Sequence, residues 1–300
     1  MLYLETPPRL IETRLFSAMP DNFRRKGVRT DWADANRQGH PVDCFIEGPS
    51  FDAQGNLYVV DIPFGRIFAI AADGAWSLVV EYEGWPNGLK IGADGRILVA
   101  DYMLGIMELD ARERRMKPVL TARNSESFRG CNDLHLARNG DIYFTDQDQT
   151  GLHDPTGRVY RYTTGGRLDC LIDTGISPNG LVLDPNEAVL FVAMTRDNAV
   201  WRMPLMRDGS VSKVGRFCSM FGPSGPDGMT MDGKGRLFVA HASLGHVLVF
   251  APNGELIARI KSCAGTTCTN VAIGGNIRDR LYITESATGS VLVADISELG

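Results

Sequence analysis

Apolar and polar residues alternate over short stretches along most of the chain, and polar turns separate these stretches. Leu89 and Ile91 alternate with polar or small neighbours, as do Met229 and Met231, and a period of two residues is that of a β-strand. A turn follows each stretch, and then a continuous apolar run such as residues 97–99. Patterns typical of helices are nearly absent, which excludes the α/β architectures. The pattern therefore predicts an all-β protein.

This unit occurs six times, and each copy begins with a polar residue that we call its anchor. The copies start at positions 47, 87, 132, 179, 227 and 270, so they are spaced 40 to 48 residues apart, the length of one propeller blade. The anchors are Glu47, Asn87, Asn132, Asn179, Asp227 and Asn270.

Within a copy, the anchor opens a first strand that a turn connects to the second. Four copies have glycine at the same place in this turn, where a hairpin needs a positive φ, namely Gly55, Gly95, Gly140 and Gly235. A third strand is predicted at residues 66–70, 106–109, 158–162, 199–203, 246–250 and 290–295, and more variable segments fit a fourth. We predict that residues 1–300 form a single six-bladed β-propeller with four-stranded antiparallel blades.

The residues before the first anchor, 1–42, form an N-terminal arm in this prediction. Residues 9–16 are expected to supply the outer strand that closes the last blade and so removes an open sheet edge. Residues 17–42 lack strand alternation, and residues 147–156 are the longest insertion after a second strand. We expect both segments to overhang the site described next, with residues 17–42 as a lid.

The six anchors are expected to meet at one mouth of the central channel, because all innermost strands begin there. An Asn or Asp alone is also explained as a turn former. Two carboxylates and four amides on one axis are different, because the carboxylates repel each other unless a cation lies between them. Oxygen donors favour Ca²⁺ first, with Mn²⁺, Mg²⁺, Zn²⁺ or Fe²⁺ as alternatives. We therefore predict one divalent metal ion on the axis.

Composition and charge narrow the choice of partner. The 300 residues are 44% hydrophobic and carry a formal net charge of -5, without a dense Lys/Arg run, which argues against nucleic acid and anionic membranes. The first residues lack a signal-peptide core and no stretch approaches the roughly 18 apolar residues of a spanning helix, so we expect a cytoplasmic protein with a small-molecule partner. Six cysteines show no CxxC spacing, and Cys263 and Cys268 are the one pair close in sequence.

Five stretches of the chain occur in the order found in a known family: IEGPSFD, GCNDLHLARNGDIYFTD, SPNGLVLD, GPDGMTMDGKGRLFVA and CTNVAIGG. Through them, about residues 41–297 resemble the regucalcin and gluconolactonase family of metal-dependent lactonases, also called the senescence marker protein family, and more distantly diisopropylfluorophosphatase and paraoxonase. The resemblance implies that Glu47, Asn179 and Asp227 bind the metal, that Asn132 contacts metal or substrate, and that Asp227 is also the general base. We select these four residues as metal ligands and Asp227 as the catalytic residue.

The chain departs from the family at one substrate-binding position. Relatives that act on aldonolactones often carry an Arg two positions before the third-blade Asn, but this chain has Gly130 there and an arginine one step earlier. Candidate substrate contacts are Asn87, Arg129, His153, His241 and Asn270. His135, within a strand, is better explained as a structural residue.

The expected activity is hydrolysis of a small lactone, with a sugar lactone as the leading candidate. In this scheme the metal polarises the carbonyl and Asp227 deprotonates the attacking water. The chain has no GxSxG motif and no triad-like grouping of Ser residues, which argues against a serine hydrolase. Two alternatives stay open, namely a phosphotriesterase or arylesterase using the same metal site, and a propeller that serves as a non-catalytic binding platform.

Overall fold

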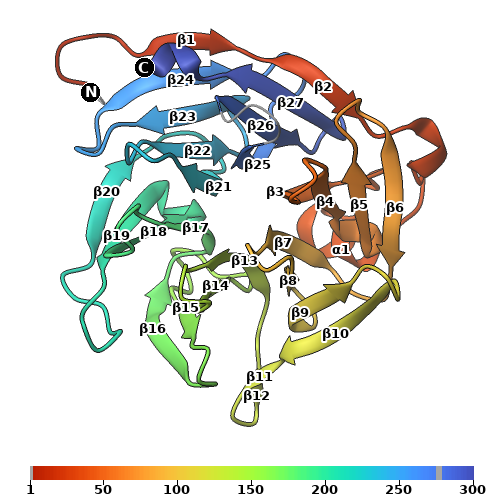
Figure 1. Cartoon of the computed structure of the whole chain (residues 1–300), viewed down its shortest axis with the longest axis horizontal. Coiled ribbons are helices and arrows are strands. Elements are labelled where there is room, and N and C mark those ends of the chain that lie inside the picture. The colour runs from red at the N-terminus through yellow and green to blue at the C-terminus, as the bar shows by residue number, and fades with distance from the viewer. Residues whose placement is uncertain (1–2, 275–278) are drawn as a thin grey trace.

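The computed structural model describes residues 3–274 and 279–300, and in this part of the chain six β-sheets surround a central axis (Figure 1). Blades one to three consist of β3 (Ile46–Phe51), β4 (Leu57–Asp61), β5 (Arg66–Ile70), β6 (Trp76–Glu81), β7 (Pro86–Ile91), β8 (Ile97–Asp101), β9 (Gly105–Asp110), β10 (Arg115–Leu120), β13 (Cys131–Leu136), β14 (Ile142–Asp146), β15 (Gly157–Tyr162) and β16 (Leu168–Gly175). Blades four to six consist of β17 (Pro178–Leu183), β18 (Val189–Met194), β19 (Ala199–Pro204), β20 (Gly215–Ser219), β21 (Pro226–Met231), β22 (Leu237–His241), β23 (His246–Phe250), β24 (Leu256–Lys261), β25 (Cys268–Ile273), β26 (Arg280–Glu285) and β27 (Ser290–Asp295), with β2 (Arg14–Ala18) as the fourth strand of the last blade. The predicted six-bladed propeller is confirmed. The turn of the sixth copy includes residues 275–278 and lies outside the described residues.

The innermost strand of each blade is irregular at or next to its anchor. In β17 the pairing register shifts between Pro178 and Leu181, so the strand is bulged around Asn179. The first strands of the other five blades show corresponding shifts. Because a bulge interrupts the regular alternation of a strand, it can turn a chosen side chain toward a new direction. Here the bulges occur where the anchors reach the axis.

Apolar side chains fill the spaces between neighbouring blades. In the described residues they form six clusters, each of which joins two adjacent blades. Between blades two and three, Leu98 packs with Phe144 and Tyr160, whose stacked rings have centroids 5.2 Å apart. This packing holds the six anchor strands in fixed positions relative to one another.

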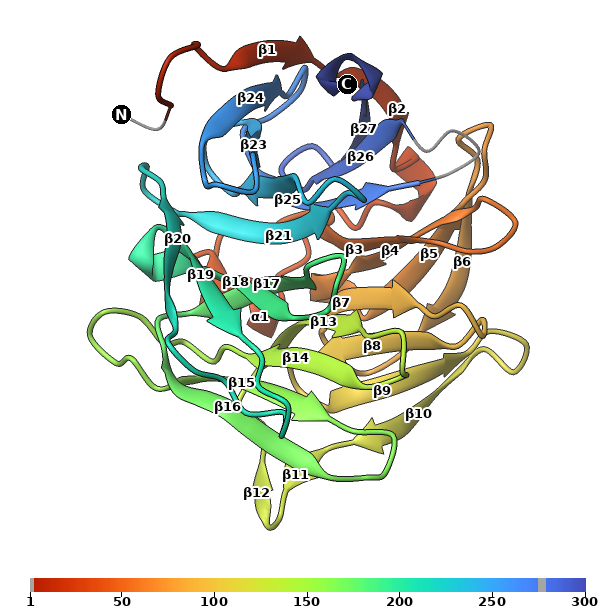
Figure 2. The same ribbon diagram turned by 60° about the vertical axis from the view of Figure 1, so that its left-hand side comes forward.

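The N-terminal segment closes the ring along two blades (Figure 2). Strand β2 pairs antiparallel with β27, which confirms that residues 14–16 help close the last blade. The prediction is wrong for residues 9–12, because β1 (Arg9–Glu12) pairs parallel with β24 in blade five. The Thr13 hydroxyl fixes the crossing between the two blades by donating to the Lys261 carbonyl at 2.8 Å and accepting from the Cys263 amide at 2.9 Å.

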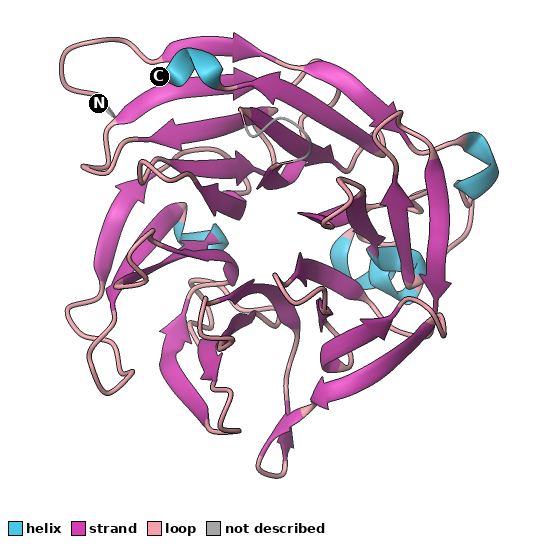
Figure 3. Ribbon diagram, in the orientation of Figure 1, coloured by secondary structure: helices cyan, strands magenta, loops and turns pink. Residues whose placement is uncertain are grey.

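Helices are few and short (Figure 3). The α-helix α1 (Asp31–Asn36) begins after Thr30, whose hydroxyl accepts a hydrogen bond from the Ala33 amide at 3.2 Å. The other helical turns are η1 (Asp21–Phe23), η2 (Ile62–Phe64), η3 (Thr195–Asp197) and η4 (Ser297–Leu299), and a small hairpin joins β11 (Ala122–Arg123) to β12 (Glu126–Ser127). Within the described ranges, no helix has the length and apolar character needed to cross a bilayer.

Candidate functional site

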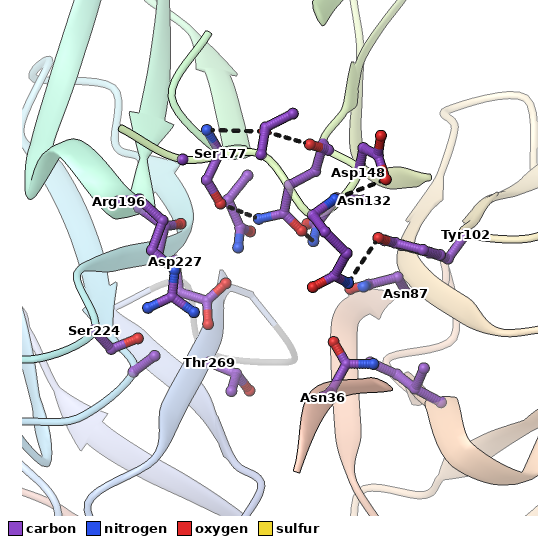
Figure 4. A pocket seen from close by; sticks show the side chains of 18 of the residues that line it. Asn36, Asn87, Tyr102, Asn132, Asp148, Ser177, Arg196, Ser224, Asp227 and Thr269 are labelled. Carbon is purple, nitrogen blue, oxygen red and sulfur yellow. Dashed lines mark hydrogen bonds between the residues drawn. The ribbon is translucent and has the colours of Figure 1, made fainter. Parts of the chain in front are cut away.

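A cavity of about 720 Å³ lies at the mouth of the channel where the anchor strands begin (Figure 4). Five of the six anchors line it: Glu47, Asn87, Asn132, Asn179 and Asp227. The N-terminal arm contributes Trp32, Asn36 and Arg37, the loop after β14 contributes residues 147–153, and η3 contributes Thr195 and Arg196. The two segments expected near the site, 17–42 and 147–156, thus both supply residues to its lining.

Three carboxyl groups lie close together beneath or beside this cavity. Glu47 and Asp133 are 4% and 1% exposed, and Asp227 is partly buried where it lines the cavity. Burial and the charges of Asp227 and Asp133 raise the pKa of Glu47 well above its ordinary value. Burial and the charge of Asp133 likewise raise the pKa of Asp227 to about 8. The site therefore holds more negative charge than its protein surroundings neutralise.

Asn270 holds the Glu47 carboxylate in place. Its Nδ2 donates to Glu47 Oε2 at 2.8 Å and lies 3.4 Å from Asp133 Oδ2. The amide is 2% exposed and does not line the cavity. Asn270 was predicted to contact substrate; in the structure it is buried and its side chain binds Glu47, so the observed contact is with the carboxylate.

A hydrogen-bonded chain also fixes the amide of Asn132. Its Nδ2 donates to Gln147 Oε1 at 2.8 Å, and Gln147 Nε2 donates to the Ser177 hydroxyl at 3.0 Å. Because the amide nitrogen is engaged on that side, the Asn132 side-chain oxygen remains available to the cavity. Figure 4 shows Asn132 and Ser177 on the same side of the pocket.

The donor set at the anchors fits a hard divalent cation. Glu47 and Asp227 offer carboxylate oxygens, and Asn132 and Asn179 offer amide oxygens. None of the ion pairs among the described residues involves Glu47, Asp133 or Asp227. The described part of the chain has no group of three or more His, Cys, Asp or Glu side chains placed to bind a metal.

Arg129 and His135 lie outside the cavity lining, in contrast to His153. Arg129 Nη1 donates to the Thr156 hydroxyl at 3.1 Å, so its guanidinium is directed along the loop rather than toward the anchors. Burial, with the nearby charge of Lys90, lowers the pKa of His135 to about 4, which keeps this strand residue neutral.

His241 occupies a position that serves a structural purpose in other blades. In blade three, Asp146 ends the second strand, and its Oδ1 accepts hydrogen bonds from the backbone amides of Arg129 and Gly130, both at 2.8 Å. Asp61, Asp101 and Glu285 likewise accept hydrogen bonds from backbone amides of the corresponding loops, those of Phe45, Trp85 and Thr267. His241 is fully buried at this position and does not line the cavity, and its Nδ1 lies 3.4 Å from the Ser243 amide. His241, predicted to contact substrate, thus lies at the strand end where other blades carry the acids that bind loop amides, outside the cavity lining.

Residues that sequence reasoning missed include Asp133, Gln147 and Arg196. Glycine follows the anchor in four copies of the repeat, whereas the third copy has Asp133 at this position. This departure from the repeat could have identified Asp133 as a candidate site residue. A Cβ on Gly88 would lie 2.4 Å from Asp133 Oδ1, so glycine makes room for this carboxylate. Gln147 begins the insertion 147–156 that was expected beside the site, but its hydrogen bond with Asn132 was not predicted. Arg196 has no comparable signal, because it lies outside the repeated pattern.

The cysteines form no disulfide among the described residues. Cys263 is exposed and Cys268 is buried, and both are free thiols. The pair close in sequence therefore stays unlinked in this structure.

The chain is similar in sequence to known proteins. The model of the SMP-30/gluconolactonase/LRE-like region matches residues 45–287. A gluconolactonase from Zymomonas mobilis is 34% identical over 208 residues, which make up 63% of this chain and 57% of that protein. Lactonase drp35 from Staphylococcus aureus is 28% identical over 240 residues, covering 76% of this chain and 72% of that protein. The chain thus matches little more than half of the length of the first of these relatives.

Solved structures of similar proteins have the same architecture. A gluconolactonase from Xanthomonas campestris superposes with a TM-score of 0.74 at 25% identity, covering 93% of this chain and 98% of that one. Regucalcin from Agrobacterium tumefaciens, described as a calcium-binding protein, superposes with a TM-score of 0.75 at 20% identity, covering 96% and 95%.

Proposed function

Because the chain belongs to the SMP-30/gluconolactonase/LRE-like family, we propose that it hydrolyses lactones with the help of a divalent cation held by Glu47, Asn132, Asn179 and Asp227. One observation carries the metal dependence. Glu47 and Asp227 line the same cavity, and burial together with neighbouring carboxylates raises the pKa of both. Neither has an ion-pair partner among the described residues. A bound cation offsets this effect, because it attracts both carboxylates at once.

The proposed reaction uses the protein residues in separate roles. Asn270 keeps the Glu47 carboxylate directed to the axis, and the Gln147–Ser177 chain keeps the Asn132 oxygen available. Asp227 accepts a proton from the water that attacks the lactone carbonyl, which requires the deprotonated carboxylate. When bound, the cation would act as a Lewis acid that polarises the carbonyl and favours ionisation of water.

Calcium is the cation that we propose first. The donors are carboxylate and amide oxygens without thiolate or imidazole, and such a set favours hard ions. The calcium-binding description of the Agrobacterium regucalcin is consistent with this choice. Mn²⁺, Mg²⁺, Zn²⁺ and Fe²⁺ are the alternatives to be compared with it.

A sugar lactone is the substrate class that we propose. The cavity lining carries many hydrogen-bonding side chains, among them Asn36, Asn87, Gln149 and His153, which suit a ring bearing several hydroxyls. The names of the relatives, gluconolactonase and lactonase, point to the same class. We further propose that the protein acts in the cytoplasm.

A lactone panel tests this proposal. Purified protein is dialysed against chelator, reconstituted with Ca²⁺, Mn²⁺, Mg²⁺, Zn²⁺ or Fe²⁺ in turn, and assayed by pH-stat, which records the acid released. We expect turnover of sugar lactones with at least one cation and none without. Turnover of phosphotriesters or aryl esters alone, or of no ester with any cation, would contradict the proposal.

A further inference from the structure

Arg196 presents a guanidinium at the wall of the cavity beside the proposed base. Figure 4 shows Arg196 next to Asp227, and the arginine charge lowers the pKa of Asp227 against the effect of burial. The side chain is exposed, and no hydrogen bond or ion pair occupies its guanidinium within the described residues. Arg196 is therefore available to a ligand that enters the cavity.

The backbone that carries Arg196 is fixed to the anchor strand of blade five. The preceding Thr195 donates through its hydroxyl to the carbonyl of Pro226 at 2.8 Å, and Pro226 immediately precedes Asp227. The Thr195 amide donates to the Ser177 carbonyl at 3.0 Å. A Cβ on Gly225 would lie 2.0 Å from the Thr195 carbonyl oxygen, so the two segments are in close contact. These contacts fix the backbone at Arg196 relative to the strand that carries Asp227.

The acids closest to Arg196 in sequence and across the cavity are engaged elsewhere. Asp197 binds Arg216, with Nη2 and Oδ1 2.5 Å apart, and accepts a hydrogen bond from Trp201 Nε1 at 2.8 Å. Asp148 lies across the pocket from Arg196 in Figure 4, accepts a hydrogen bond from the Gln149 amide at 2.7 Å, and forms no ion pair with Arg196 among the described residues. Neither carboxylate neutralises Arg196.

The charges of the lining favour a negative ligand once a divalent cation is present. Among the lining residues, a divalent cation would offset Glu47 and Asp227, which leaves Asp148 opposed by Arg37 and Arg196. Asp133 lies outside the lining, where the charge of Lys90 opposes it. Arg37, at the end of α1, has its guanidinium 5.8 Å from the centroid of the Phe45 ring and also has no ion-pair partner in the described residues. A neutral sugar lactone could accept hydrogen bonds from these guanidinium groups but would not neutralise their charge.

We propose that the substrate is an acidic lactone, whose ring carbonyl reaches the anchors while a second, anionic group is bound by Arg196. A guanidinium binds carboxylate or phosphate oxygens through two parallel hydrogen bonds, which gives both strength and orientation. Carboxylate and phosphate share this recognition chemistry. This inference rests on the proposed lactone hydrolysis and specifies which lactones are preferred.

Two matched pairs of lactones test the inference. D-glucono-γ-lactone and D-glucaro-γ-lactone share a ring and differ by a terminal carboxylate. D-glucono-δ-lactone and its derivative phosphorylated at the terminal hydroxyl differ by a phosphate. Each is assayed with the reconstituted wild type, Arg196→Gln, Arg196→Lys and the control Arg207→Gln, which changes an exposed arginine in the turn between β19 and β20.

The wild type should prefer the acidic member of at least one pair, and that pair identifies the anion. Arg196→Gln should lower kcat/KM for that acidic lactone by about 10- to 100-fold, chiefly through KM, and change the neutral lactone by less than about 3-fold. Arg196→Lys should recover part of the loss, and Arg207→Gln should behave like the wild type. Equal effects of Arg196→Gln on acidic and neutral lactones would overturn the inference, because Arg196 would then act only through Asp227.

A binding measurement keeps the inference separate from the proposed reaction. Calorimetry with gluconate and glucarate, which are not hydrolysed, compares wild type and Arg196→Gln with and without the cation. Tighter binding of glucarate, lost in Arg196→Gln, supports an anion contact even if no lactone is turned over. Equal binding of both acids to both proteins would overturn the inference while leaving lactone hydrolysis intact.

Discussion

At the scale of single residues, the site is organised around negative charge that the protein itself leaves uncompensated. Glu47 receives hydrogen bonds from Asn270 and from its neighbouring backbone amide, but these bonds do not offset its burial next to Asp133 and Asp227. Such an arrangement destabilises the metal-free fold and stabilises any state in which a cation is bound. A trade between stability and function is therefore expected at these positions.

Replacing Glu47 by Gln tests this trade. At a pH high enough to ionise both Glu47 and Asp227, Glu47→Gln should raise the metal-free free energy of unfolding by about 1–3 kcal/mol, because it removes one of two neighbouring buried charges. The variant should also lose most of the stabilisation that added Ca²⁺ gives the wild type. Thermal and urea unfolding with and without Ca²⁺ measure both effects. Asn87→Ala is the comparison, and an Asn87 variant that loses the Ca²⁺ effect more than Glu47→Gln would contradict the ligand assignment.

Replacing Asp227 by Asn separates its two proposed roles. The amide keeps one oxygen for the cation but cannot accept the proton from water. We expect kcat to fall by roughly 10²–10⁴, the usual contribution of a general base, even at saturating cation. Activity should be measured across a cation titration, with bound metal determined in the same samples. Near-normal turnover at high cation concentration would show that Asp227 is a ligand only and that another group takes the proton.

The residues of the site could be predicted only in part from the sequence. The repeat identified all six anchors, and five of them line the cavity. It could not show that Asn270 turns its amide toward Glu47, because the direction of a side chain depends on neighbours from other blades. Arg196 was missed because it lies in a loop outside the repeat, and only the fold brings it beside Asp227.

At the scale of elements, the anchor strands bring the side chains together and glycines allow the strands to approach. A Cβ on Gly228 would lie 2.0 Å from the side-chain carbon of the Asn270 amide, the group that holds Glu47. The sequence predicted these strands and their turns, because alternation and turn glycines are local signals. It misplaced residues 9–12, because the choice between the edges of blades five and six depends on contacts distant in sequence, such as Thr13 with Lys261.

Gly228→Ala tests the contact between neighbouring anchor strands. The new methyl group should displace the Asn270 amide, lower the free energy of unfolding by about 1–3 kcal/mol and weaken Ca²⁺ binding. Gly233→Ala in the same blade is the matched control, since a Cβ there has no neighbour within 4 Å. Chemical denaturation and calorimetric Ca²⁺ titration provide the measurements. Similar behaviour of the two variants would mean that packing around Asn270 does not determine the site.

At the scale of the whole molecule, the six blades act as a rigid frame for one polar cavity. Apolar clusters join each blade to the next, and the N-terminal strand β2 pairs with β27 to complete the ring. The frame fixes the positions of the anchors, so the proposed cation binding should depend mainly on the charge and protonation of the carboxyl groups. This makes the pH dependence of stability a property that the structure predicts.

Metal-free protein should lose stability as pH rises toward 8. The pKa of Asp227 is raised to about 8 in the fold, so its contribution is fully present below its unfolded pKa and is lost as pH rises through the folded value. Added Ca²⁺ should therefore stabilise the protein more at pH 8 than at pH 5, and its binding near neutral pH should release protons. Thermal unfolding across this range, and calorimetry in buffers of different ionisation enthalpy, check the two effects. If the stabilisation by Ca²⁺ did not depend on pH, Ca²⁺ binding would not displace a proton from Asp227, which would contradict this prediction.

The most direct test of cation-dependent lactone hydrolysis records bound metal and turnover in one titration. Chelated protein receives Ca²⁺, or the cation that the lactone panel identifies, in small steps, and each sample is divided between metal analysis and pH-stat assay with a sugar lactone. We predict no turnover in the metal-free sample and a rise in turnover that reaches its plateau as about one cation per chain becomes bound. Full lactone turnover in the metal-free sample, or bound cation without any change in turnover, would contradict the proposed function.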